Sequence, residues 1–190
     1  MAGLGNPGQA YQHTRHNLGW MVLVQAARRW GVTFSRQGHA LQGRGSIEGL
    51  PVTLVLPQTW MNQTGAVVHS VLQDLHLITP DLIVVYDDLD LPLGGIKIKT
   101  LGGAGGHNGL RSVLEYLESE DFTRLKVGIG RPPAHVDPAQ FVLSSFLPEE
   151  RKQIETMLPK AVDALECLIC QGASIAMNRF HGQAVQQENE

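Results

Sequence analysis

Apolar residues recur along the chain in two patterns, one with the period of a helix and one typical of strands. The helical period covers residues 18–30, 63–75, 110–117 and the stretch from 148 to about 171. Short apolar or alternating runs predict strands at residues 41–48, 52–57, 82–86, 96–99 and 125–129. Because hairpin and crossover connections both occur, we expect a single three-layer α/β domain over residues 1–190, with a mixed central β-sheet flanked by helices.

Local signals mark where these elements end. Gly31 should stop the first helix, and residues 49–51 should form the turn of a hairpin. Pro159 lies inside the last helical pattern and should kink or split that helix. The polar residues 186–190 suggest a frayed tail.

Composition narrows the class of protein. With 43% hydrophobic and 17% charged residues, the chain resembles a soluble globular protein, and we expect a cytoplasmic one. No apolar run approaches the roughly 20 residues of a membrane span, and no signal-peptide pattern opens the chain. Cys167 and Cys170 form a C-x-x-C late in a helix, which favours small buried thiols over a redox or zinc site.

Charge is unevenly distributed. The formal net charge is −3, which argues against a general nucleic-acid binder. However, no Asp or Glu precedes Glu48, whereas that stretch holds Arg15, Arg28, Arg29, Arg36 and Arg44. A second basic cluster comprises Lys97, Lys99, Arg111, Arg124, Lys126 and Arg131. This distribution predicts selective contact with a phosphate-bearing partner.

Candidate catalytic groups stand where apolar runs stop. His16 is the best candidate for a general base near neutral pH, and Asp87, at the end of a buried strand, is placed to orient its ring. Asn6, Asn62 and Asn108 close three different loops. Asparagine can stabilise an oxyanion and bind water, so these side chains favour hydrolysis by a bound water.

Other interpretations of the same residues remain. Each asparagine could simply form a cap or a turn, and Asp88 is expected to be a solvated loop charge. The spacing Gly3-x-Gly5-x-x-Gly8 matches a dinucleotide fingerprint, but Pro7 and the lack of an early acid disfavour it. No G-x-S-x-G elbow occurs. His16, His107 and nearby aspartates could bind a metal, although no compact ligand pair is present.

Taken together, the motifs resemble those of the bacterial peptidyl-tRNA hydrolase family. The resemblance rests on GLGNPG at residues 3–8, Tyr11, TRHN at 14–17 with Gly19, Trp60-Met61-Asn62 with Gly65, DDLDLP at 87–92, GGAGGHNGLRS at 102–112 and RLKVGIGRP at 124–132. Each motif alone is weak, but the ordered set extends to His181 and covers nearly the whole chain.

The resemblance implies an ester hydrolase that separates a peptide from tRNA after premature termination of translation. It implies that His16 is the general base, that Asp87 orients it, and that no metal or cofactor takes part. The residues that it places at the peptide and the tRNA 3′ end are Asn6, Tyr11, Trp60, Met61, Asn62, His107 and Asn108. It further implies that Lys99 and Lys126 bind the tRNA 5′ phosphate and that residues around 133–150 form a mobile lid.

The sequence departs from the family pattern in two places. Only Met1 and Ala2 precede GLGNPG, which predicts either a shortened central strand or a start site placed too late. Trp60 replaces a smaller aromatic residue. The alternative function is a non-catalytic RNA-binding relative of the same fold. Membrane and DNA are not expected as partners, and a monomer is expected because no heptad or long apolar edge is evident.

Overall fold

The computed structural model describes residues 1–181; the tail predicted at residues 186–190 lies outside this range. The strands are β1 (Ala2–Gly3), β2 (Ser35–Gln37), β3 (Ala40–Ile47), β4 (Leu50–Pro57), β5 (Ile83–Asp88), β6 (Ile96–Lys99) and β7 (Thr123–Gly128). The α-helices are α1 (Leu18–Trp30), α2 (Thr64–Asp74), α3 (Asn108–Leu117), α4 (Pro138–Val142), α5 (Pro148–Gln171) and α6 (Ala173–Phe180). Short 3-10 turns are η1 (Gln9–Tyr11), η2 (Arg15–Asn17), η3 (Met61–Gln63) and η4 (Thr79–Asp81).

The strands form one mixed sheet in the order β2-β3-β4-β1-β5-β7-β6. The central strand β1 is parallel to both β4 and β5, and β7 is parallel to β5. The hairpin strands β2 and β3 and the edge strand β6 run antiparallel to their neighbours. The carboxyl ends of β1, β4, β5 and β7 therefore share one edge of the sheet, which we call the carboxyl edge.

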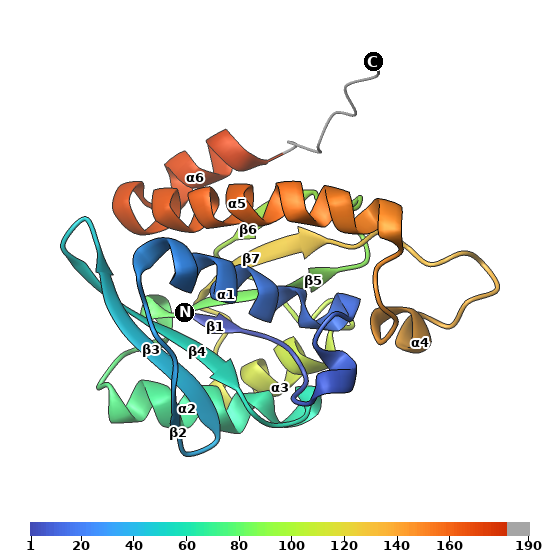
Figure 1. Cartoon of the computed structure of the whole chain (residues 1–190). Coiled ribbons are helices and arrows are strands. Elements are labelled where there is room, and N and C mark those ends of the chain that lie inside the picture. The colour runs from blue at the N-terminus through green and yellow to red at the C-terminus, as the bar shows by residue number, and fades with distance from the viewer. Residues whose placement is uncertain (182–190) are drawn as a thin grey trace.

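Helices cover both faces of this sheet, as Figure 1 shows. One core lies under α1, α5 and α6, and a second lies under α2 and α3. The three-layer α/β architecture with a mixed sheet is thus confirmed.

The central strand β1 has two residues in this structure, and glycines let helix α1 approach it closely. A Cβ on Gly19 would lie 2.2 Å from the carbonyl oxygen of Val85, and one on Gly3 would lie 2.6 Å from the oxygen of Gly19. No larger side chain fits at either position. This packing places the turn η2, directly before α1, against the end of β5.

Several element boundaries differ from prediction. The hairpin turn is the pair Glu48-Gly49, both with positive φ, so Leu50 and Pro51 belong to β4. Strand β2 was not predicted, because its three residues are all exposed and carry no apolar alternation.

Helix α5 runs through Pro159 without a break, so the prediction of a split helix is wrong. A proline leaves the carbonyl four residues earlier, that of Glu155, without its helical donor. Glu155 is exposed, so that carbonyl can be hydrated, while Met157, Ala161 and Leu165 keep the helix packed on the core.

Candidate active site

Two asparagines fix the loop that follows β1. The backbone N–H of Asn6 donates to Asn17 Oδ1 over 2.9 Å, and Asn17 Nδ2 donates back to the Asn6 carbonyl over 2.9 Å. Asn6 Oδ1 accepts the N–H of Met61 at 2.8 Å, which joins this loop to the one after β4. Within residues 1–181 the Asn6 Nδ2 donates to no protein group, so this amide N–H remains available to a ligand.

Next to Asn17, the turn η2 presents His16 to the end of β5. His16 Nδ1 lies 3.0 Å from both oxygens of Asp87. Both side chains are buried, at 7% and 3% exposure. Because a carboxylate only accepts hydrogen bonds, Nδ1 carries a hydrogen, and in the neutral ring Nε2 then holds the lone pair.

His107 occupies the other side of the same carboxylate. Its Nε2 lies 3.1 Å from Asp87 Oδ1, and its Nδ1 accepts the N–H of Leu110 at 3.1 Å as the N-cap of α3. The ring centroids of His16 and His107 are 4.7 Å apart. Since Nδ1 of His107 must accept, its hydrogen is on Nε2 and the ring is neutral.

Burial and neighbouring charges shift the pKa values of Asp87 and His107. Burial alone would raise the pKa of Asp87, but the two histidines beside it outweigh burial and hold that pKa well below its usual range. Burial lowers the pKa of His107, and the Asp87 charge only partly opposes this. Asp87 is therefore a fixed anion, and His107 a neutral donor to it.

His16 opens onto a cleft of about 480 Å³ at the carboxyl edge of the sheet. Asp88, Asn108, Lys126 and Arg131 also line it, as do the glycine-rich loop before α3 and the α4 residues Pro138, Ala139 and Val142. A base with a free lone pair therefore faces a space that has cations on one wall and apolar groups on another.

A second cavity, of about 560 Å³, lies at the opposite edge of the sheet between the start of β4 and the end of α2. Its lining is mainly apolar, including Val52, Val71 and Leu72, and its only side-chain carboxylate is that of Asp81. It is slightly larger, but it holds no acid–base pair. The chemistry thus selects the cleft at His16.

His16, Asp87 and His107 also form a cluster whose ligand atoms lie close enough together to hold a metal ion. Within residues 1–181 it is the one such cluster. Metal binding would need the lone pair of His107 Nε2, but Leu110 already uses the lone pair of Nδ1. A neutral imidazole offers only one lone pair. The hydrogen bonds therefore suit a His–Asp–His relay better than a metal centre.

The other predicted site residues differ in how exposed they are. Met61 is buried, and the rings of Tyr11 and Trp60 meet edge to face at 5.7 Å, with Trp60 52% exposed. Asn62 lies within η3, so it is not an N-cap, and it is exposed. Asn108 is exposed and lines the cleft. Among residues 1–181, Asn6 is the one of the three asparagines whose side chain forms a hydrogen bond with a second loop.

Asp88 was expected to be a solvated loop charge, and this prediction is wrong. It is the last residue of β5, it is 9% exposed, and its Oδ2 forms an ion pair with Lys126. The sequence does not reveal this pair because β5 and β7 are 35 residues apart and meet only in the sheet. Lys126 therefore reaches the cleft already partnered by a carboxylate.

Lys97, Lys99 and Lys126 share one face of the ribbon formed by β6 and β7. Lys97 stands directly opposite Lys126, and Lys99 is opposite Arg124. Diagonal neighbours such as Lys99 and Lys126 are expected to lie about 7 Å apart. The ribbon therefore brings the two predicted phosphate ligands close enough to share one anion.

Two arginines counted in the basic clusters are not on the surface. Arg124 is 1% exposed and donates to the carbonyls of Gly102, Glu120 and Phe122, which fixes the start of the glycine-rich loop. Arg15 is 3% exposed and holds a distant segment of the chain. Sequence alone shows a cation but not its burial, so both were misassigned.

Comparison with known proteins completes the description. A family model described as "Peptidyl-tRNA hydrolase" matches residues 1–189. The peptidyl-tRNA hydrolase of Syntrophotalea carbinolica is 42% identical over 184 residues, 96% of either chain, and that of Bacillus subtilis is 40% identical over 184 residues, 96% of this chain and 98% of its own. A crystal structure of peptidyl-tRNA hydrolase from Acinetobacter baumannii superposes with a TM-score of 0.90 at 34% identity, covering 95% of this chain and 93% of the other. Among residues 1–181, none of the helices is long and apolar enough to cross a membrane.

Proposed function

The chain belongs to the peptidyl-tRNA hydrolase family and hydrolyses the ester between a peptide and its tRNA, and we propose that the general base of this reaction is His16. The observation that carries the proposal is the hydrogen bonding of Asp87. It accepts from His16 Nδ1 and from His107 Nε2, and so leaves His16 Nε2 as a lone pair facing the cleft.

The reaction then needs one water and no cofactor. His16 Nε2 takes a proton from the water, whose oxygen attacks the ester carbonyl. The tetrahedral intermediate collapses by breaking the bond to the ribose oxygen, which receives the proton from His16. The products are a tRNA with a free ribose hydroxyl and a peptide carboxylic acid, which ionises to the carboxylate by releasing the remaining water proton to solvent. A positioned base of this kind contributes about 10²–10⁴-fold to the rate.

Asp87 supports His16 in two ways. Its hydrogen bond fixes the ring tautomer and orientation, and its charge stabilises the imidazolium that forms during attack. His107 in turn holds the carboxylate from the other side. Because His107 is kept neutral by burial and by the N–H of Leu110, it does not compete for the proton.

Asn6 is the strongest candidate for stabilising the oxyanion. Its Oδ1 is held by the N–H of Met61 and its backbone by Asn17, so the orientation of the amide is fixed before substrate binds. Its Nδ2 is left as a donor. A single donor of this type is worth about 3–4 kcal/mol where measured.

The tRNA would be bound around the cleft. Tyr11, Trp60, Asn62 and Asn108 offer aromatic and amide groups for the 3′ end, and Lys99 and Lys126 offer cations for the 5′ phosphate. To bind phosphate, Lys126 must loosen its ion pair with Asp88. We expect the protein to act as a monomer in the cytoplasm, where translation supplies its substrate.

A non-catalytic RNA-binding relative is the alternative. Such a protein would need the basic ribbon but not a histidine oriented by a buried carboxylate. The buried His16 and Asp87, and the side chain of His107 at 8% exposure, carry a desolvation cost that binding alone does not require. The enzyme is therefore the better-supported function.

The direct test is release of peptide from a purified N-blocked peptidyl-tRNA, followed with and without EDTA. We expect multiple turnovers at an equal rate in both conditions. No release would leave the binding alternative, and release that EDTA abolishes would replace the metal-free mechanism.

A further inference from the structure

Arg15, one residue before His16, is buried against a segment more than 125 residues away in the chain. Its Nη1 donates to the carbonyl of Ser145 at 2.6 Å and to the Oγ of Ser144 at 2.7 Å, and its own backbone N–H donates to the Ser144 carbonyl at 3.0 Å. Thr14 and Ser145 also form a β-bridge. The turn that carries His16 is thus fastened to residues 144–145.

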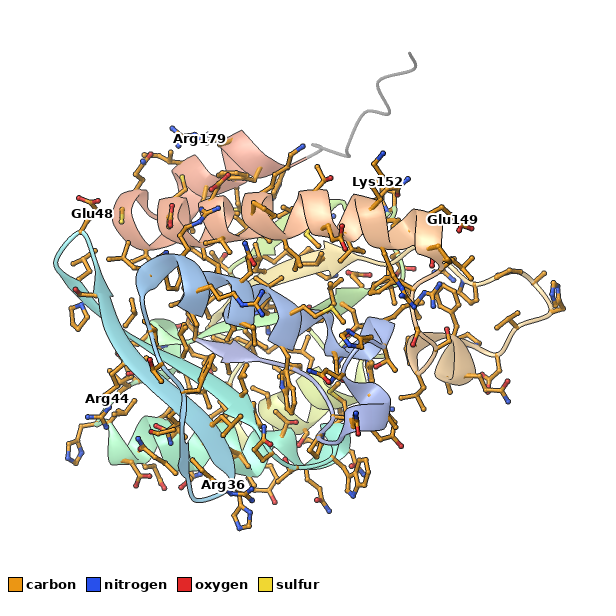
Figure 2. All side chains as sticks on the ribbon, in the orientation of Figure 1. Arg36, Arg44, Glu48, Glu149, Lys152 and Arg179 are labelled. Carbon is orange, nitrogen blue, oxygen red and sulfur yellow. The ribbon has the colours of Figure 1, made fainter. Side chains whose placement is uncertain are left out.

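Both terminal nitrogens of the Arg15 guanidinium have partners at this place, whereas its buried Nε has none among residues 1–181. Its Nη2 binds Glu150 Oε2 at 2.5 Å, and its guanidinium stacks 4.2 Å from the Phe141 ring and 5.1 Å from the Phe146 ring. Glu150 also accepts the N–H of Leu147. Its neighbours Glu149 and Lys152 point away from the body of the protein (Figure 2), so Glu150 is the acid of this helix start that turns inward.

The segment held by Arg15 is one end of the lid segment, which we define as residues 131–147. Its other end carries the exposed ion pair between Arg131 and Asp90, whose side chains are 77% and 63% exposed. In between, α4 brings Pro138, Ala139 and Val142 to the wall of the cleft opposite His16. One end of the lid segment is therefore anchored to the buried Arg15 and the other to an exposed ion pair. Between them the loop and α4 project from the body of the protein (Figure 1).

The turn η2 is held from both sides. Asn17 binds Asn6, Arg15 binds the lid segment, and His16 lies between them. A shift of Arg15 would move the backbone of His16. It would thereby change the 3.0 Å distance between His16 Nδ1 and Asp87 Oδ1. The orientation of the His16 ring and the position of α4 therefore both depend on the contacts of Arg15 with residues 144–145.

We propose that Arg15 is a positioning residue that couples the lid segment to the general base. When residues 141–147 are seated on Arg15, η2 holds His16 against Asp87 and α4 closes the peptide side of the cleft. This inference rests on the proposed function, since it assigns His16 as the base. It adds that the position of α4 in the wall of the cleft and the position of His16 are coupled, because both depend on Arg15.

The test variant is Arg15→Lys, which keeps the positive charge but has one terminal nitrogen in place of the two that bind Ser145 and Glu150. The control is Arg29→Lys, the same substitution in the surface ion pair of Arg29 with Asp163. Thermal unfolding establishes that both variants fold. We expect Arg15→Lys to lower kcat by roughly 10- to 100-fold, with KM for peptidyl-tRNA changed by less than about threefold. Chymotrypsin should cut it faster at Phe141, within the lid segment, whereas Arg29→Lys should behave as the unmodified chain does.

Retained kcat in folded Arg15→Lys would overturn the proposal, as would an equal loss in Arg29→Lys. If Arg15→Lys does not fold, Glu150→Gln takes its place, with a smaller loss of kcat and faster cleavage expected; unchanged values would overturn the proposal. If the unmodified chain itself releases no peptide, the proposed function fails. The cleavage rates then decide separately whether Arg15 anchors the lid segment.

Discussion

At the scale of single residues, the sharing of Asp87 between two histidines determines how both rings are protonated. His107 has a lowered pKa in the folded protein, so the folded state binds its proton less readily than the unfolded state, where histidine has a pKa of about 6.5. Its neutral form therefore stabilises the fold above about pH 6.5. That contribution is lost as the pH falls from there toward the folded pKa.

We predict that His107→Asn weakens this pH dependence. The oxygen of an asparagine can still accept the N–H of Leu110, and the side chain does not titrate. Between pH 7.5 and 5.5, urea unfolding should show that the unmodified chain loses more free energy of unfolding than the variant, by at most about 1.4 kcal/mol per pH unit. Parallel curves for the two proteins would show that His107 is not held neutral by the fold.

Individual residues also show what the sequence can and cannot predict. The pairing of His16 with Asp87 could be predicted because Asp87 ends a buried strand and the loop that holds His16 follows the first short strand, and such ends meet at one edge of a parallel sheet. The burial of Arg15 and Arg124 and the pairing of Asp88 could not. Each depends on a partner from a distant segment, which no local pattern specifies.

At the scale of elements, the close approach of α3 to η3 sets the position of the loop that holds Asn6. A Cβ on Gly109 would lie 2.4 Å from Met61 Sδ and 3.1 Å from Leu4 Cδ1. The N–H of Met61 in turn binds Asn6 Oδ1. A larger residue at position 109 therefore pushes on the support of the oxyanion donor.

We predict that Gly109→Ala lowers both stability and kcat. Overpacking a core costs about 1–3 kcal/mol, while an alanine gains up to about 1 kcal/mol over glycine in a helix. Gly103→Ala is the matched control in the same glycine-rich stretch, since a Cβ there meets no atom within 4 Å. Equal unfolding midpoints and equal kcat for the two variants would contradict the account.

Most helices and strands could be predicted from the sequence, because the spacing of their apolar residues and the residues that end them are local features. Strand β6 has the predicted bounds, and α1 ends at Gly31 in the left-handed conformation. Strand β2 and the uninterrupted α5 were missed because both depend on neighbours. Strand β2 exists through its pairing with β3, and Pro159 is tolerated because α5 is packed against α1.

At the scale of the whole molecule, a net charge of −3 coexists with a basic ribbon on β6 and β7. The net charge limits non-specific binding, while the ribbon supplies a local site for phosphate. Binding of tRNA should therefore weaken with salt in proportion to the few lysines that contact phosphate.

We predict that Lys99→Ala with Lys126→Ala weakens tRNA binding and reduces the slope of log Kd against log salt by roughly two, about one for each lysine. Lys152→Ala removes an exposed lysine from the start of α5 (Figure 2) and should leave the slope unchanged. Because loss of Lys126 leaves Asp88 unpaired, Lys99→Ala alone is measured as well. A slope unchanged in every variant would exclude the ribbon as the phosphate site.

The central claim is that His16, oriented by Asp87, activates water without a metal. Its most direct test is single-turnover hydrolysis of a peptidyl-tRNA in EDTA by His16→Ala, beside His39→Ala as a control at an exposed histidine. We expect a loss of about 10²–10⁴-fold for His16→Ala with tRNA binding retained, and full activity for His39→Ala. Turnover by His16→Ala at the rate of the unmodified chain would contradict it.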